Sequence, residues 1–158
     1  MNNLDLSDSG ISLLKRLEGF SARMYRDSAG KPTIGFGHLI VPGDGVAPGD
    51  ILEDVQATGL LRRDVQKAVN AVNQAVSVEL NQNQFDALVI FVYNVGAGAF
   101  HGSHLLQLLN QGDFVGASNQ LLLWCKVHTP QGRFVELAGL KNRRVAEQIL
   151  FNTKVISN

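Results

Sequence analysis

The sequence predicts an α+β fold, in which a small N-terminal lobe contains a β-hairpin and a mostly helical lobe follows it. Strand-forming residues and turn residues gather within residues 20–40, and helical periodicity dominates from about residue 51 to 151. No repeat or linker divides the 158 residues, a length that can bury a core without disulfides or metals. We therefore expect a single domain over 1–158, with lobes at about 9–50 and 51–151.

The first helix is predicted to begin at Ser7 or Ser9, either of which is a good N-cap, and to end at Gly19. Its apolar residues have near-helical spacing: Ile11, Leu14 and Leu17. Glu18 therefore falls in the last turn. The negative end of the helix dipole and partial desolvation both disfavour an ionised carboxyl there, so we expect Glu18 to be able to donate a proton.

A β-hairpin is predicted within residues 20–40, where the turn-forming stretch Ser28–Pro32 separates residues of high strand propensity. If the hairpin turns at Gly30, Asp27 and Thr33 lie opposite each other on the two strands. This arrangement would put a carboxylate beside a hydroxyl.

Helical patterns account for most of the remaining chain. A long pattern runs from about Asp50 to Val76, although Gly59 weakens its middle. The later predicted helices cover about 82–95, ending at Gly96; about 103–109, ending near Gly112; a stretch through Ala117 and Leu121 to Trp124; and about 137–151.

Charge and composition exclude several classes of protein. Lys and Arg number 14 and Asp and Glu number 14, so the net charge is zero, which argues against general binding to nucleic acid or to anionic membranes. Cys125 is the only cysteine, so no internal disulfide is possible. Residues 1–10 lack the features of a secretory signal and the apolar runs are short, so we expect no membrane anchor. We also expect a monomer.

Glu18, Asp27 and Thr33 together suit acid-catalysed cleavage of a glycosidic bond. That reaction needs one protonated carboxyl and one ionised partner, and a hydroxyl can hold a water. Taken singly, each acidic residue is more often a solvated surface group, so the trio needs support from the surrounding sequence.

The surrounding sequence supplies that support. Leu17-Glu18-Gly19-Phe20, Tyr25-Arg26-Asp27 and Gly30-Lys31-Pro32-Thr33-Ile34-Gly35-Phe36-Gly37-His38 closely resemble the signature of the phage-type lysozymes. Further similarity covers Gln84–Leu88, Tyr93–Gly96 and the glycine loop after it, Trp124, and a C-terminal block from Gly139 to Glu147. The resemblance, over about residues 9–151, implies a lysozyme-like fold with an active-site cleft between the lobes.

The resemblance also implies roles for individual residues. Glu18 would be the general acid, with Asp27 and Thr33 as its catalytic partners. The saccharide-contacting residues of the family would fall on Leu39, Tyr93, Ser103 and Gln120. Arg143 or Arg144 would approach Glu18, and we predict a contact between His38 and Asp64 that supports the motif. No cofactor is implied.

The implied activity is hydrolysis of the β-1,4 bond between N-acetylmuramic acid and N-acetylglucosamine in peptidoglycan, for host-cell lysis. The enzyme would wait in the host cytoplasm, need a holin for release, and then act on the cell wall in the periplasm. Attack by water would invert the anomeric centre, whereas attack by Asp27 would retain it. The neutral charge predicts weak electrostatic attraction to the anionic wall.

Three other readings are open. A lytic transglycosylase would cleave the same bond without water, but it can work with a single acid. A catalytically silent peptidoglycan-binding protein would not need the intact trio. A zinc site could use His101-x-x-His104 and Cys125-x-x-His128, which have ligand-like spacing, but both pairs lie in or beside segments that resemble a family without metal, so we expect none.

Overall fold

The computed structural model describes residues 2–156. Its internal contacts divide the chain into two compact units, which we call the sheet unit, Ile11–Gln66, and the helical unit, Met1–Gly10 together with Lys67–Asn158. The α+β class is confirmed. The helix α2 groups with the sheet, and a lobe boundary near residue 50 stays a prediction.

The first helix, α1 (Asp8–Glu18), begins and ends at the predicted residues. Ser7 is the cap, since its Oγ accepts a hydrogen bond from the Gly10 amide at 3.0 Å. At the other end the Gly19 amide donates to the Lys15 carbonyl at 3.0 Å, and the φ of Gly19 is +73°. Glu18 is therefore the last residue of the helix.

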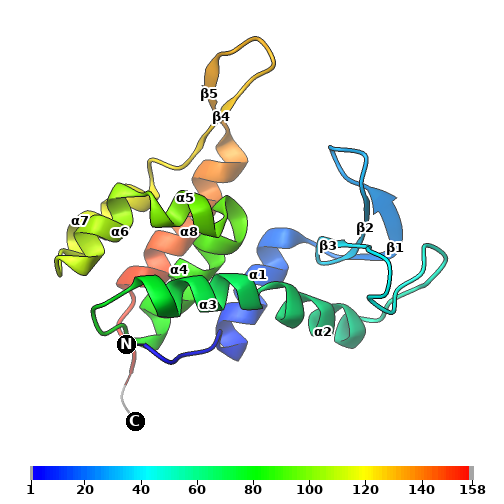
Figure 1. Cartoon of the computed structure of the whole chain (residues 1–158), viewed down its shortest axis with the longest axis horizontal. Helices are drawn as coiled ribbons and strands as arrows, with labels where there is room; N and C mark the ends of the chain where they lie inside the picture. The colour runs from blue at the N-terminus through cyan, green and yellow to red at the C-terminus, as the bar shows by residue number, and fades with distance from the viewer. Residues whose placement is uncertain (1, 157–158) are drawn as a thin grey trace. The chain divides into compact units, whose positions relative to one another are not determined.

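The sheet unit contains three antiparallel strands in the order β1 (Ser21–Arg26), β2 (Pro32–Gly35) and β3 (His38–Leu39). The helix α2 (Asp54–Asp64) packs on β2 and β3 (Figure 1). The packing is close at Gly35, where an added Cβ would lie 3.0 Å from the Cβ of Ala57. A side chain at position 35 would therefore force the helix away from the sheet.

The register of the hairpin differs from the prediction. Thr33 lies opposite Tyr25, and Arg26 lies opposite Pro32, so Thr33 does not face Asp27. The reason is the turn. The Gly30 amide donates to the Asp27 carbonyl at 2.8 Å, and Gly30 takes a φ of +76° as the last residue of a three-residue loop. Asp27 is thus the residue at which the turn begins.

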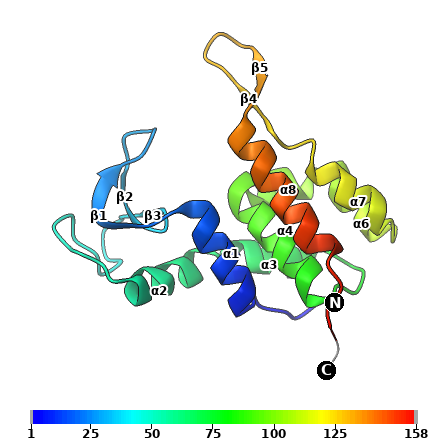
Figure 2. The ribbon, with the colours of Figure 1, turned by 180° about the vertical axis from the view of Figure 1, so that it is seen from behind.

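The helical unit is built around α4 (Gln82–Val95), in which every residue from Phe85 to Val92 is buried. Figures 1 and 2 show α4 beside α8 (Ala138–Asn152), and α7 (Phe114–Leu121) also packs on α8. The remaining helices are α3 (Gln66–Ala75), α5 (Ala97–His101) and α6 (His104–Asn110). The predicted ends of α4 at Gly96 and of α6 near Gly112 are confirmed.

Three elements differ from expectation. The single long helix predicted up to Val76 is two helices, because the helical pattern is interrupted at Val65, while Gly59 lies inside α2. The expected glycine loop after α4 forms the short helix α5. Residues 126–136, for which the sequence predicts no element, form a second hairpin of β4 (Lys126–His128) and β5 (Phe134–Glu136).

Candidate active site

Glu18 is placed by the end of α1 and by the turn between β2 and β3. Its side chain is half-buried. A Cβ added at Gly37 would lie 3.6 Å from its Oε2, so the carboxyl group lies directly against the backbone of that turn. Gly37 itself has a φ of +83°, which a side chain would strain. Gly37 therefore allows the turn to form and leaves space beside the carboxyl group of Glu18.

Asp27 is fixed at the first turn of the sheet unit. Its Oδ1 accepts hydrogen bonds from the backbone amides of Ala29 at 2.8 Å and Lys31 at 2.9 Å. Its own amide donates to the Lys31 carbonyl at 3.0 Å. The loop thus holds one carboxylate oxygen in a defined position.

Thr33 lies on the central strand and is only 4% exposed. It pairs with Tyr25 on β1 and with Leu39 on β3, and its Oγ1 donates to the Lys31 carbonyl at 3.1 Å. The residue opposite Thr33 is Tyr25, two positions before Asp27, so the predicted pairing of Asp27 with Thr33 is wrong. A joint role of the two side chains stays a prediction. Leu39 is 39% exposed at the edge of the sheet.

His38 supports this region from within the sheet unit. Its Nδ1 lies 2.8 Å from Oδ2 of Asp64 on α2, which confirms the predicted contact. Its Nε2 lies 2.9 Å from Oδ2 of Asp44, a partner that sequence reasoning missed. The sequence contains an indication of this contact, because Asp44 lies between two glycines in a turn-rich stretch shortly after His38.

The charge of this cluster follows from its contacts. Burial works against protonation of His38, but the hydrogen bonds and charges of Asp44 and Asp64 raise its pKa overall. Hydrogen bonds from the Val41 amide, from His38 and from the Val46 amide lower the pKa of Asp44 to about 2. Through its two ring nitrogens, His38 therefore joins the loop after β3 to α2.

The other predicted saccharide contacts belong to the helical unit. Tyr93 on α4 and Gln120 on α7 are both half-buried. Ser103 is 4% exposed and caps α6, since its Oγ donates to the Phe100 carbonyl at 2.7 Å and accepts from the Leu106 amide at 3.1 Å. Its side chain therefore has a structural role, and a saccharide contact at each of these residues stays a prediction.

The two arginines of α8 make buried contacts in the helical unit. Arg144 donates to both carboxylate oxygens of Glu147, at 2.7 and 2.6 Å, to the Trp124 carbonyl at 2.9 Å and to Oδ1 of Asn94. Arg143 donates to Glu147 at 3.3 Å. Burial raises the pKa of Glu147, and the two guanidinium groups oppose that effect. An approach of Arg143 or Arg144 to Glu18 stays a prediction.

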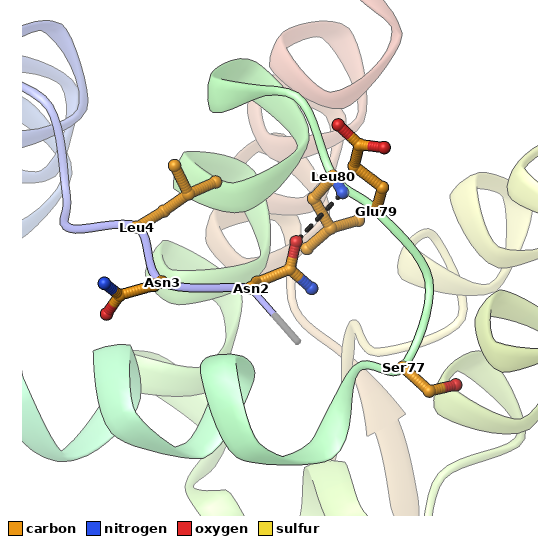
Figure 3. Close-up of a pocket in the computed structure, with 6 residues that line it drawn as sticks. All are labelled: Asn2, Asn3, Leu4, Ser77, Glu79 and Leu80. Carbon is orange, nitrogen blue, oxygen red and sulfur yellow. Dashed lines mark hydrogen bonds between the residues drawn. The ribbon is translucent and has the colours of Figure 1, made fainter.

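A pocket in the helical unit lies where residues 2–4 pass the loop between α3 and α4 (Figure 3). Its lining is Asn2, Asn3, Leu4, Ser77, Glu79 and Leu80. Oδ1 of Asn2 accepts a hydrogen bond from the Leu80 amide at 3.0 Å, so the pocket marks where the N-terminal segment is attached. None of the predicted site residues lines it.

The residues of the zinc hypothesis are distributed over several elements. His101 ends α5, His104 begins α6, Cys125 is buried just before β4, and His128 is exposed on β4. Within residues 2–156, no group of three or more His, Cys, Asp or Glu side chains is arranged to hold a metal ion.

A glutamate at a helix end, an antiparallel sheet that carries Asp27 and Thr33, and a helical unit built on α4 define a lysozyme-like α+β protein. Comparison with known proteins agrees, since the family model described as Phage lysozyme matches residues 15–147. The chain belongs to the phage lysozyme family. It is therefore an enzyme of the class that degrades peptidoglycan for host lysis.

Individual relatives support this assignment. The endolysin of Acyrthosiphon pisum secondary endosymbiont phage 1 is 37% identical over 150 residues, which are 95% of this chain and 99% of that protein. The endolysin of Bacillus phage PZA is 41% identical over 157 residues, which are 98% of this chain but only 58% of that protein. Among solved structures, the endolysin from Escherichia coli O157:H7 phage FAHEc1 has a TM-score of 0.89 at 39% identity and covers 99% of both chains.

In the part of the chain that the structure describes, no helix has both the length and the apolar character needed to cross a membrane.

Proposed function

We propose that this chain is a muramidase that hydrolyses the β-1,4 bond between N-acetylmuramic acid and N-acetylglucosamine, with Glu18 as the general acid. The arrangement of the sheet unit carries the proposal. Glu18 lies against the turn at Gly37, Asp27 begins the turn between β1 and β2, and Thr33 lies on β2. Acid-catalysed glycoside cleavage requires two carboxyl groups, which Glu18 and Asp27 supply, and the hydroxyl of Thr33 can hold a water.

The roles follow from the chemistry of each group. Glu18 protonates the glycosidic oxygen as the sugar approaches an oxocarbenium-like state. Asp27 stabilises that positive charge or, together with Thr33, orients the attacking water. The amides of Ala29 and Lys31 hold Oδ1 of Asp27, so we assign the approach of sugar or water to Oδ2. The hydroxyl of Thr33 donates to Lys31, and its oxygen can still accept a hydrogen bond from water.

The proposed saccharide contacts are Leu39, Tyr93, Ser103 and Gln120. An exposed apolar side chain and an aromatic ring suit the apolar faces of sugar rings, and polar side chains suit their hydroxyls. In the cell, we propose that the protein is monomeric and stays in the host cytoplasm until a holin permits its release to the wall. The similarity to endolysins supports only the role in host lysis; the monomeric state, the location and the holin rest on the resemblance to the family.

Zymography on peptidoglycan with the wild type and Glu18→Gln tests the assignment. We expect the variant to lose nearly all clearing activity, because an amide cannot supply the proton. Glu79→Gln, at an exposed acidic position, is the matched control and should clear as the wild type does. Equal clearing by Glu18→Gln would overturn the role of Glu18.

Mass spectrometry of the released fragments tests the reaction type. Hydrolysis gives fragments with reducing ends, whereas a lytic transglycosylase gives anhydro sugars. Anhydro products from the wild type would replace the proposed hydrolysis with that second activity. A protein that binds peptidoglycan and releases no fragment would be a silent binding protein.

A further inference from the structure

The second hairpin presents an exposed aromatic ring between basic side chains. Figures 1 and 2 both show β4 and β5 extending away from the helices beyond the start of α8. Lys126 lies opposite Glu136, and His128 lies opposite Phe134. Because opposite and alternate residues of an antiparallel pair share a face, these four side chains form one surface, which we call the hairpin face.

Phe134 is the centre of the hairpin face. Its ring centroid lies 4.6 Å from that of His128, and Nζ of Lys126 lies 5.9 Å from it. These contacts hold the ring in place, yet Phe134 is 60% exposed. An aromatic ring that is fixed by its neighbours and open to solvent offers a flat apolar surface at a low cost in side-chain entropy.

The hairpin and the first turn of α8 are together basic although the chain is neutral. Residues 126–141 contain Lys126, Arg133 and Lys141 but only one acidic residue, Glu136. Glu136 forms an ion pair with Lys141 at 3.1 Å. The chain as a whole has 14 basic and 14 acidic residues, whereas this segment has a local excess of two positive charges. It can attract an anionic polymer where the average charge of the protein cannot.

We propose that the hairpin face binds a glycan strand of peptidoglycan, as a contact additional to those of the catalytic residues. This inference rests on the proposed function for its choice of polymer. The apolar face of a sugar ring stacks on Phe134, and Lys126 and His128 donate hydrogen bonds to sugar hydroxyls. Lys126 also complements the carboxylates of the stem peptides. The weak attraction expected from the zero net charge is thereby offset at one place on the surface.

Sedimentation with purified sacculi measures this binding, and the Glu18→Gln background keeps the sacculi intact. In that background we expect Phe134→Ser and Phe134→Leu each to weaken binding about fivefold or more, which corresponds to about 1 kcal/mol. Phe134→Tyr should bind as the parent does, because it keeps the ring. Lys126→Gln should weaken binding at low salt, and the difference should shrink as salt rises.

Matched variants control for exposure and charge. Ile149→Ser removes an apolar side chain that is 62% exposed on α8, and Lys67→Gln removes an exposed lysine on α3. Both should bind sacculi as the parent does. Thermal unfolding reports whether each variant is folded. If Phe134→Ser is not folded, the comparison of Phe134→Leu with Phe134→Tyr decides whether the ring is needed.

Three results would overturn the inference. The first is unchanged binding to sacculi in all the hairpin variants. The second is a loss of binding in the control variants that equals the loss in the hairpin variants. A third result is loss of binding to anionic phospholipid vesicles with unchanged binding to sacculi, which would assign the hairpin face to lipid. The proposed function is tested independently of this binding. It fails if the wild type releases no fragments with reducing ends, whereas sedimentation measures binding of the Glu18→Gln protein.

Discussion

Nδ1 of His38 lies 2.8 Å from Oδ2 of Asp64, so an imidazole in the family motif is joined to a carboxylate on α2. Asp44 takes the other ring nitrogen at 2.9 Å. Both ring nitrogens face carboxylates, and only the imidazolium donates from both. The charged form of His38 therefore links β3, the loop after it and α2, next to the strand that carries Thr33.

The stability of the protein is predicted to depend on pH through this cluster. The pKa of His38 is raised above 6.5, so its contribution is complete below pH 6.5 and is lost as pH rises through the pKa of the folded state. The pKa of Asp44 falls from 3.8 to about 2, so its contribution is complete above pH 3.8 and is lost as pH falls toward 2. The cluster therefore stabilises most between pH 3.8 and 6.5.

His38→Gln measures this effect. The difference in Tm between wild type and variant should be largest near pH 5 and should shrink as pH rises through the pKa of folded His38, because the imidazolium then loses its proton. His104→Gln, at an exposed histidine, should show no such trend. A difference in Tm of the same size at both pH values would contradict the linkage.

Replacing Asp86 by Ala is predicted to loosen the N-terminal segment of the helical unit. Asp86 is 1% exposed and accepts hydrogen bonds from the amide and the hydroxyl of Ser7 and from Nε2 of Gln82. Removing the carboxylate takes away the acceptor of these hydrogen bonds, which lowers the free energy of unfolding by about 1–3 kcal/mol. Urea denaturation measures the loss, and Glu79→Ala at an exposed position should be near neutral.

Glu147→Gln is predicted to be strongly destabilising. Glu147 and Arg144 are 0% and 1% exposed, and the variant would leave a buried guanidinium group without its anion. We expect a loss of about 3 kcal/mol or more in the free energy of unfolding. Glu136→Gln breaks the exposed ion pair with Lys141 and should change stability little. Similar losses in the two variants would show that burial is not the cause.

Gly37→Ala is predicted to reduce both stability and activity. Alanine at a φ of +83° is strained by about 1 kcal/mol, and its methyl group would contact the carboxyl group of Glu18. Gly112 has the same φ of +83° but open space around an added Cβ, so Gly112→Ala is the matched control. Both variants should lower Tm, and only Gly37→Ala should lower kcat on peptidoglycan. Equal kcat values in the two variants would show that the turn at Gly37 does not affect catalysis by Glu18.

The elements that the sequence predicts well are those whose ends are specified locally. Ser7 and Gly19 delimit α1, and Gly96 ends α4, because a cap needs only a hydroxyl or a positive φ within a few residues. The first hairpin was predicted in place but not in register. Gly30 is the last residue of the loop rather than its centre, so Thr33 meets Tyr25 and not Asp27.

The second hairpin and the interruption at Val65 were not predicted from the sequence, and each has its own reason. The strands of the second hairpin have only three residues each and are almost wholly exposed, so no alternation of buried and exposed positions marks them in the sequence. Val65 has ordinary helical propensity and is buried, whereas Gly59, the weakest helix former nearby, stays inside α2. At Val65, packing therefore overrode helix propensity.

By itself the sequence determined the fold class, the family, the position of Glu18 at a helix end and the pairing of His38 with Asp64. Those features depend on local caps and on motif residues at fixed spacing. Only the tertiary structure decided that Asp44 takes the second nitrogen of His38, that Asp86 holds Ser7, and that Glu147 neutralises Arg144. Each of these contacts depends on which charges are buried together, and a buried charge is tolerated only where the fold supplies its partner.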